Sequence, residues 1–225
     1  RISDVEHGAE PIGDTYPFLA FIDYGTERFE ETLARQRVVL DNVLNVWTGT
    51  TPDGYRMFKS THYAAKVVSD RGGDHYYNVR AANPGMFYTW FTKDPEGQRF
   101  LVDWAASWRD AILAERDGKP TGIWPIIVTW PERRFVMSSA RPWYDPGYFA
   151  YPGGRRIYDV LLAAYDITGD DRFLDPQRRI LELMREVGVK GEGFDAGAEG
   201  VSRITPRFRA RRAADVATEH EKGSL

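Results

Sequence analysis

The sequence predicts an all-α fold built from pairs of helices, and two observations carry this prediction. In the segment 157–188, apolar residues recur at helical spacing on both sides of a short polar turn that contains Gly169. The same pattern occurs three times, as an apolar or aromatic run, a polar turn, and then Arg-Phe opening a new helical pattern. The three phenylalanines, Phe29, Phe100 and Phe173, follow one another at nearly equal intervals, as expected of helical repeat folds.

Length and composition restrict the possible classes of protein. The 225 residues, 42% of them hydrophobic, suffice for one domain with a sizeable core. A net charge of −3 with mixed signs does not favour nucleic acid or a membrane as partner. The absence of cysteine excludes disulfides, thiolate metal sites and a cysteine nucleophile. Because the chain starts at Arg1 and lacks a long apolar run, we expect a soluble fragment or processed chain, periplasmic or secreted if a signal peptide was removed.

The first half of the chain contains three predicted helices. A short apolar helix spans 16–24, and a longer one spans 27–46, with Thr26 as its N-cap. Residues 55–68 are ambiguous between strand and helix. The third helix begins at residue 80 or 83 and ends at 92, which places Pro84 near its first turn.

The second half begins with the clearest helix, residues 95–116, capped by Asp94 and carrying a buried stripe that includes Trp104 and Trp108. Five prolines prevent regular helix through 119–151, and a long aromatic loop of this kind is usually functional. We therefore expect a single α/α domain over residues 1–190, incomplete as a toroid. A Gly-rich, charged tail is expected over 191–225.

Three segments resemble the six-hairpin (α/α) barrel carbohydrate-active enzymes, which include glycoside hydrolases and polysaccharide lyases. They are YDVLLAAYDITGDDRFLD, GMFYTWFTKDPEGQRFLVDWAASW and GKPTGIWP, and the resemblance covers residues 16–187. It implies a toroid that binds sugar at its open end against aromatic rings. Alternatively, the loop rings only seal the loop against the barrel. The candidate platforms are Trp124, Trp143, Tyr144, Tyr148 and Tyr151.

The densest polar cluster is the segment DHYYNVR at 74–80. Lyases of this superfamily use Tyr or His as base or acid, and Asn, Arg or His to neutralise a uronate carboxylate, so the resemblance implies such roles here. His75 is the first choice for proton transfer because its side chain titrates near neutral pH. A hydrogen-bonded loop that enters a helix is the alternative interpretation. The further candidates are Asp74, Tyr77, Asn78 and Arg80, with Lys59, His62 and Arg141 as substrate-binding residues.

Hydrolysis would instead need two carboxyl groups facing the scissile bond. Loop carboxylates that could serve are Asp74, Glu132 and Asp145. Aromatic neighbours could desolvate Asp145 and raise its pKa, although a residue before Pro146 can equally be a plain turn former.

We interpret the aspartates around the turn at Gly169 as turn formers and helix caps, because their spacing does not match a calcium loop. The expected function is cleavage of glycosidic bonds in a poly- or oligosaccharide, by β-elimination or hydrolysis, without cofactor or metal. The alternative is a non-catalytic helical-repeat module that binds carbohydrate or protein, which the long aromatic segment 119–151 disfavours. The aspartates concerned are Asp166, Asp170, Asp171 and Asp175.

Overall fold

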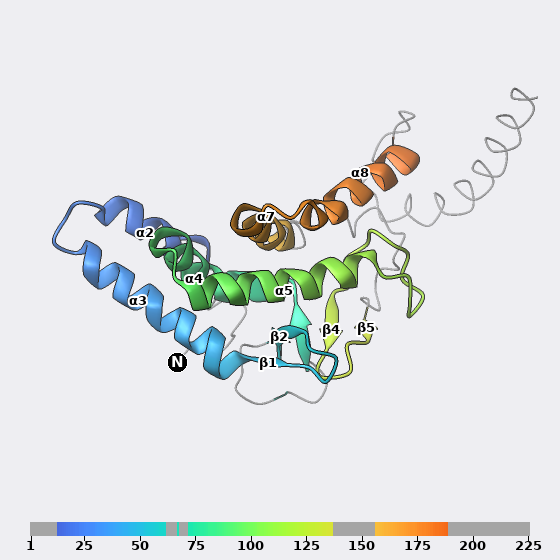
Figure 1. Cartoon of the computed structure of the whole chain (residues 1–225), viewed down its shortest axis with the longest axis horizontal. Helices are drawn as coiled ribbons and strands as arrows, with labels where there is room; N and C mark the ends of the chain where they lie inside the picture. Colours follow the sequence, from blue (N-terminus) through green and yellow to red (C-terminus); the bar gives the residue numbers. More distant parts are fainter. Residues whose placement is uncertain (1–12, 62–66, 68–71, 137–155, 189–225) are drawn as a thin grey trace, which may run out of the picture.

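The computed structural model describes residues 13–61, 67, 72–136 and 156–188, and this part of the chain is mostly helical with a few short strands. The mainly helical character predicted from the sequence is therefore confirmed (Figure 1). The main helices are α2 (Tyr16–Asp23), α3 (Phe29–Asn42), α4 (Asn78–Thr92), α5 (Pro95–Leu113), α7 (Arg156–Thr168) and α8 (Asp175–Gly188).

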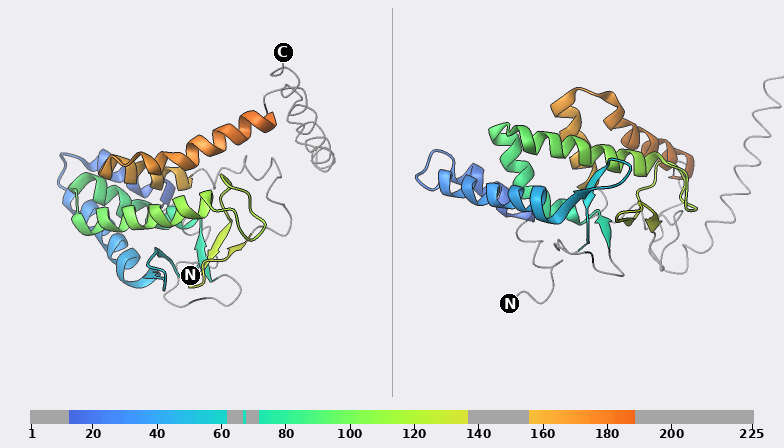
Figure 2. Two further views of the ribbon diagram at one scale, coloured as in Figure 1. Left: turned by 45° about the vertical axis from the view of Figure 1, so that its right-hand side comes forward. Right: turned by 60° about the horizontal axis from the view of Figure 1, so that its bottom comes forward.

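Two small antiparallel sheets form in the long connections between helices. Residues Val43–Trp47 continue α3 as a π-helix, and a hairpin of β1 (Thr48–Thr50) and β2 (Arg56–Phe58) follows it. The second sheet has the order β3-β4-β5. Because β3 precedes α4 and β4 follows α5, this sheet joins the two connections, and both sheets lie on the same side of the helices (Figures 1 and 2). Its strands are β3 (Gly73–His75), β4 (Ile127–Thr129) and β5 (Phe135–Val136).

Helix α5 is the central element, packing against α4, α7, α8 and β2. Its buried stripe is the one that the sequence predicts, and the side chains of Trp104 and Trp108 are fully buried. Asp94 caps the helix as expected, because its carboxylate accepts a hydrogen bond from the Gly97 N–H at 2.9 Å. The Phe58 and Phe100 rings pack on the Trp104 ring, at 5.2 and 5.5 Å between centroids.

The C-terminal end of α5 is closed by the loop that follows it, three residues earlier than expected. The carbonyl of Ile112 accepts from the ammonium group of Lys119 and from the N–H of Gly122, both at 2.8 Å. Lys119 also donates to the carbonyl of Pro120, and only 1% of its surface is exposed. Burial lowers the pKa of Lys119 to about 7.

The three polar turns predicted from the repeated pattern share one backbone feature. In each, a residue just after the first helix has positive φ, namely Gly25 at 77°, Lys93 at 58° and Gly169 at 67°. At Lys93 and Gly169 the left-handed residue directly follows the helix, whereas α2 is already ended by Tyr24, whose ψ is 126°. The third turn differs, because a 3-10 turn over Asp171–Leu174 precedes α8.

The back-to-back hairpin predicted for residues 161–187 forms only in part. Helices α7 and α8 make few contacts with each other, and α8 packs on α5 while its far end extends away from α7 (Figure 1). The 3-10 turn explains the difference. Phe173 in this turn is buried in the core, and Asp170 accepts from the Arg172 N–H at 3.0 Å, so the chain changes direction before α8 begins.

Helix α4 begins at Asn78, earlier than predicted, so that Pro84 lies in its interior. Proline has no N–H, and the carbonyl of Arg80 consequently loses its usual helical donor. Gly13 packs directly on this defect, since a Cβ at Gly13 would lie 2.3 Å from the Arg80 carbonyl oxygen. Asn83 donates to the Gly13 carbonyl at 2.6 Å. The proline thus provides a docking place for the segment that carries Asp14.

The junction of α4 and α5 allows a direct test of close packing. A Cβ at Gly97 would lie 2.0 Å from the hydroxyl oxygen of Thr89, which already donates to the Gly85 carbonyl at 2.8 Å. We expect Gly97→Ala to lower the free energy of unfolding by about 1–3 kcal/mol in urea titrations. The overlap should outweigh a gain in helix propensity of about 1 kcal/mol.

The double variant Gly97→Ala/Thr89→Ala is the matched control, because it removes the side-chain atoms nearest to the new methyl group. In the Thr89→Ala background, the Gly97→Ala substitution should lower the free energy of unfolding less than it does in the wild-type background. Equal stability of Gly97→Ala and wild type would contradict the close approach of the two helices.

Candidate functional site

The polar cluster at 74–80 divides into an inner and an outer set. Asp74, Tyr76 and Asn78 are buried, whereas His75 and Tyr77 are half-buried. Asp74 and His75 belong to β3, where successive side chains point to opposite sides, whereas Tyr76 and Tyr77 lie in the turn before α4. The cluster read from the sequence as one group therefore performs two separate tasks.

The inner set forms a buried hydrogen-bond network with α5. The carboxylate of Asp74 accepts from the indole N–H groups of Trp104 at 2.5 Å and Trp108 at 3.1 Å, and from the amide of Asn78 at 2.9 Å. A fourth donor is the backbone N–H of Phe58. Burial raises the pKa of Asp74 to about 7, although the four donors favour the carboxylate.

Asp74 and Asn78 are enclosed at 1% and 0% exposure, so their side chains do not reach a polymer outside. Their hydrogen bonds hold β3 and the first turn of α4 on α5. We therefore regard both as positioning residues for the outer set.

The outer set begins with a stacked pair of rings. The His75 and Tyr77 rings lie 5.0 Å apart between centroids, with 12° between their planes. The Nδ1 atom of His75 accepts the backbone N–H of Tyr77 at 3.0 Å. A neutral His75 accordingly carries its proton on Nε2, which makes Nε2 the hydrogen-bond donor of the ring.

Two arginines extend this pair into a charged group. The guanidinium of Arg80 lies 5.1 Å from the Tyr77 ring centroid and 3.4 Å from a carboxylate oxygen of Asp14. Arg156, the first residue of α7, binds the other oxygen of Asp14 at 2.7 Å. The N-terminal turns of α4 and α7 add the positive ends of two helix dipoles. The carboxylate of Asp14 thus lies between two guanidinium groups.

Asp14 and Arg156 were missed by the sequence reasoning. Asp14 lies in the polar segment before residue 16, and Arg156 directly precedes the predicted helical pattern that begins at Ile157. Nothing local, however, indicates that residues 14, 80 and 156 meet.

The structure places the remaining candidates as follows. Trp124 is 2% exposed and packs edge-on against Tyr158, at 5.9 Å and 86°, so its ring is not an open platform. Lys59 is half-buried and follows β2. The other site residues predicted from the sequence lie outside the described residues, and so does the tail 191–225: His62, Arg141, Trp143, Tyr144, Asp145, Tyr148 and Tyr151.

Arg133 and Glu132 lie in the turn between β4 and β5. Arg133 is 5% exposed, stacks 3.4 Å above the Tyr55 ring centroid and binds Asp53 at 3.0 Å. It also donates to the Ser107 carbonyl of α5 at 3.3 Å. Arg133 therefore clamps the two sheets to α5, whereas Glu132 is exposed.

The aspartates near Gly169 act in part as predicted. Asp170 caps the 3-10 turn and binds Arg172 at 2.7 Å, and the Arg172 guanidinium lowers the pKa of Asp170 to about 2. Asp175 pairs with Arg178 at 3.0 Å. Among the described residues, no group of three or more His, Asp or Glu is arranged to hold a metal ion.

Residues 13–61, 72–136 and 156–188 include no helix with the length and apolar character needed to cross a bilayer.

The raised pKa of Asp74 predicts a pH dependence of stability. Its folded pKa of about 7 exceeds the usual value of 3.8, so the folded state binds a proton that the unfolded state releases in this interval. The stability contributed by this proton is complete below pH 3.8 and is lost as the pH rises through 7. Relative to Asp74→Asn, the wild type should lose up to about 1.4 kcal/mol per pH unit between these limits.

The measurement is a series of urea unfolding curves across this interval for the wild type and Asp74→Asn. Glu132→Gln is the matched control, because it removes an exposed carboxyl group and should leave the pH profile of the wild type unchanged. Parallel profiles of stability against pH for the wild type and Asp74→Asn would contradict the prediction, because they would show that Asp74 has the same pKa in the folded and unfolded states.

Comparison of the chain with models of protein families, with curated proteins and with solved structures finds no match. The site is therefore interpreted from its own geometry.

Proposed function

We propose that this chain is a carbohydrate-active enzyme that cleaves a uronate-containing polymer by β-elimination. The observation that carries the proposal is the position of Arg80, which lies over the Tyr77 ring of the stacked His75–Tyr77 pair and shares Asp14 with Arg156. A substrate carboxylate needs positive charge next to it, and proton transfer at the adjacent carbon needs an acid and a base in reach. The outer set supplies both kinds of group at one place.

The proposed architecture is part of an α/α toroid with the site at its loop end. Three pairs of consecutive helices, each with a left-handed residue in the turn after the first helix, support it. Further support comes from the sheet β3-β4-β5, which brings together the connections that precede α4 and follow α5. The outer set lies where these connections meet the N-terminal ends of α4 and α7.

The residues have separate roles in the proposed reaction. Arg80 and Arg156 bind the uronate carboxylate and stabilise the enolate-like charge that builds up when the C5 proton leaves. Tyr77, in its phenolate form, takes that proton on its side-chain oxygen. The bond between C4 and the glycosidic oxygen breaks, its electron pair leaves with the oxygen, and a C4–C5 double bond forms in the sugar.

His75 donates rather than accepts in this scheme. Its Nδ1 already accepts the Tyr77 N–H, so the neutral ring presents an N–H at Nε2. This N–H donates a hydrogen bond to the leaving glycosidic oxygen, and the neutral Tyr77 passes the proton that it took from C5 to that oxygen. Protons therefore balance: one moves from C5 to Tyr77 and from there to the new chain end, which restores the phenolate.

The decisive assay follows the ultraviolet absorbance of an unsaturated uronate product on polygalacturonate, alginate and a glycosaminoglycan, with reducing ends measured in parallel. Absorbance that rises together with reducing ends is the expected result. His75→Ala and Tyr77→Phe should each lower kcat by about a hundredfold or more, because the first removes the hydrogen-bond donor to the leaving oxygen and the second removes the proton-transfer group. Arg156→Ala should raise KM more than the other two variants.

Tyr165→Phe and Arg35→Ala are matched controls, since Tyr165 lies on α7 and Arg35 is an exposed residue of α3 paired with Glu31. Both should retain wild-type rates. Reducing ends without absorbance would mean hydrolysis and would overturn the elimination chemistry. Binding of the polymers without any product would favour the non-catalytic module instead.

A further inference from the structure

A hollow lies between α4, α5 and α7, at the opposite end of α4 from the proposed active site. Its volume is about 210 Å³, below the roughly 300–1,000 Å³ of pockets for drug-sized ligands, so it fits one ring with its substituents. Arg80 and Trp90 are ten residues apart on α4, which separates the two places by about 15 Å along the helix. The residues that define its chemistry are Met86, Trp90, Lys93, Gln98, Asp166 and Ile167.

One wall of the hollow is an aromatic ring in a fixed orientation. Trp90 is 50% exposed although it is a large apolar residue. The rings of Phe21 and Phe87 pack against it, at 6.1 and 5.6 Å between centroids. Their contacts fix the indole plane while half of its surface stays open. Such a ring offers a flat apolar face to the C–H side of a sugar.

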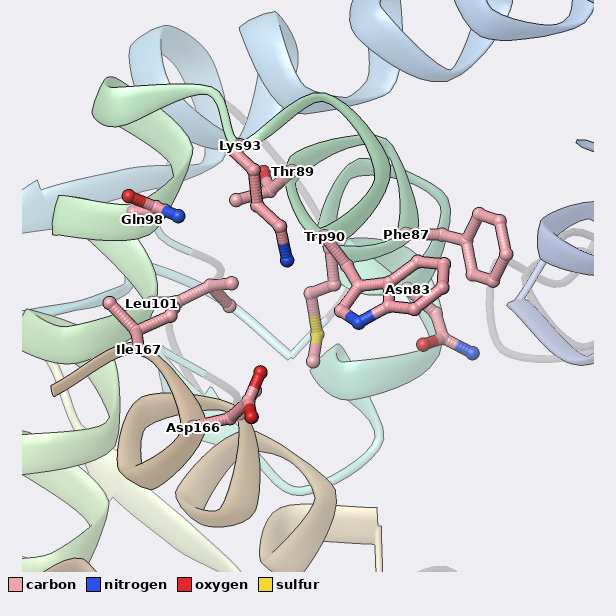
Figure 3. Close-up of a pocket in the computed structure, with 11 residues that line it drawn as sticks. Asn83, Phe87, Thr89, Trp90, Lys93, Gln98, Leu101, Asp166 and Ile167 are labelled. Carbon is pink, nitrogen blue, oxygen red and sulfur yellow. The ribbon is translucent and has the colours of Figure 1, made fainter. Parts of the chain in front are cut away.

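Two oppositely charged groups face the same space. Lys93 comes from the α4–α5 turn and Asp166 from α7, and Figure 3 shows both side chains directed into the hollow from opposite sides. The ammonium group of Lys93 lies 5.5 Å from the Trp90 ring centroid. Neither side chain forms an ion pair with another residue of the described ranges. Gln98 adds an amide with one acceptor and two donor hydrogens.

The backbone at Lys93 holds this arrangement in place. Lys93 adopts φ 58°, a left-handed conformation that costs a non-glycine residue energy and is enriched at functional sites. The close contact of Gly97 with Thr89 brings the start of α5 against α4 and thereby sets the wall that carries Gln98.

We propose that this hollow binds a single acidic monosaccharide unit, with the sugar carboxylate at Lys93 and hydroxyl groups at Asp166 and Gln98. The C–H face of the ring packs on Trp90. The ammonium group of Lys93 donates a charge-assisted hydrogen bond to the sugar carboxylate, and Asp166 accepts hydrogen bonds from sugar hydroxyls. The inference goes beyond the proposed reaction, because binding here requires none of the groups at His75.

The test uses methyl glucuronide and methyl glucoside as probes. A monosaccharide has no sugar leaving group at C4, so the elimination reaction cannot interfere. The indole N–H resonances of the ¹⁵N-labelled protein are followed by NMR, and Trp90→Phe identifies the resonance of Trp90. The Trp90 resonance should shift with the glucuronide at millimolar concentration and more weakly with the glucoside.

Substitutions at the two charged groups separate their roles. Lys93→Met should weaken glucuronide binding about tenfold and leave glucoside binding unchanged, because only the carboxylate loses its partner. Asp166→Asn should weaken both probes. Arg99→Met, an exposed cation of α5 outside the hollow, is the matched control and should bind like the wild type.

The proposal is overturned if neither probe shifts the Trp90 resonance, or if Lys93→Met binds both probes as the wild type does. Equal affinity for the two probes would also overturn it. The Lys93 and Asp166 variants are both at exposed positions, and circular dichroism should show that they fold. Their elimination rates on polymer should stay at the wild-type level, whereas Arg156→Ala should leave the Trp90 response intact, so failure at one site is distinguishable from failure at the other.

Discussion

The arrangement of this chain depends on one buried carboxylate. Asp74 lies on a three-residue strand that would not hold its place alone, and two indole N–H groups from the central helix α5 fix it there. Indole is a donor without an acceptor, so two tryptophans at the spacing of one helical turn make a matched receptor for a carboxylate. Unpaired buried polar groups are costly, and each of these groups therefore requires the others.

This interaction joins parts of the chain that are far apart in sequence. Asp74 belongs to the first long connection and Trp104 and Trp108 to α5, while Asn78 opens α4. Once Asp74 is held, strand periodicity directs His75 outward, and the turn before α4 stacks the Tyr77 ring on the His75 ring. The positions of the proton-transfer groups thus follow from the burial of their neighbours. The outer set stays accessible because the inner set satisfies its own hydrogen bonds.

The two sites that we propose occupy opposite ends of α4, and a local irregularity accompanies each. Near the start of the helix, Pro84 leaves the Arg80 carbonyl open to Gly13, and this brings Asp14 to Arg80 and Arg156. At the end of the helix, the left-handed Lys93 carries its ammonium group back over Trp90. The polar groups of both sites come from different helices, and packing on α5 sets their spacing.

Local features of the sequence were sufficient for much of the secondary structure. The cap at Asp94, the left-handed Gly169 and the buried stripe of α5 were predictable, because each depends on residues within one or two turns. The start of α4 was predicted too late, since an internal proline is normally a poor helix residue and the packing of Gly13 compensates for it only in three dimensions. The departure of α8 from α7 had the same origin, because burial of Phe173 is a property of the core and not of the turn.

The sequence by itself determined which chemical groups are available: the His, Tyr, Asn and Arg of segment 74–80, the two tryptophans of α5 and the absence of cysteine. Only the tertiary structure decided which of them face outward and which are buried. A pattern of residue types does not show which side chains become buried, and burial separates Asp74 and Asn78 from His75 and Tyr77. Likewise, the meeting of Asp14 with Arg80 and Arg156 depends on the packing of α4 and α7 around α5, which no local spacing encodes.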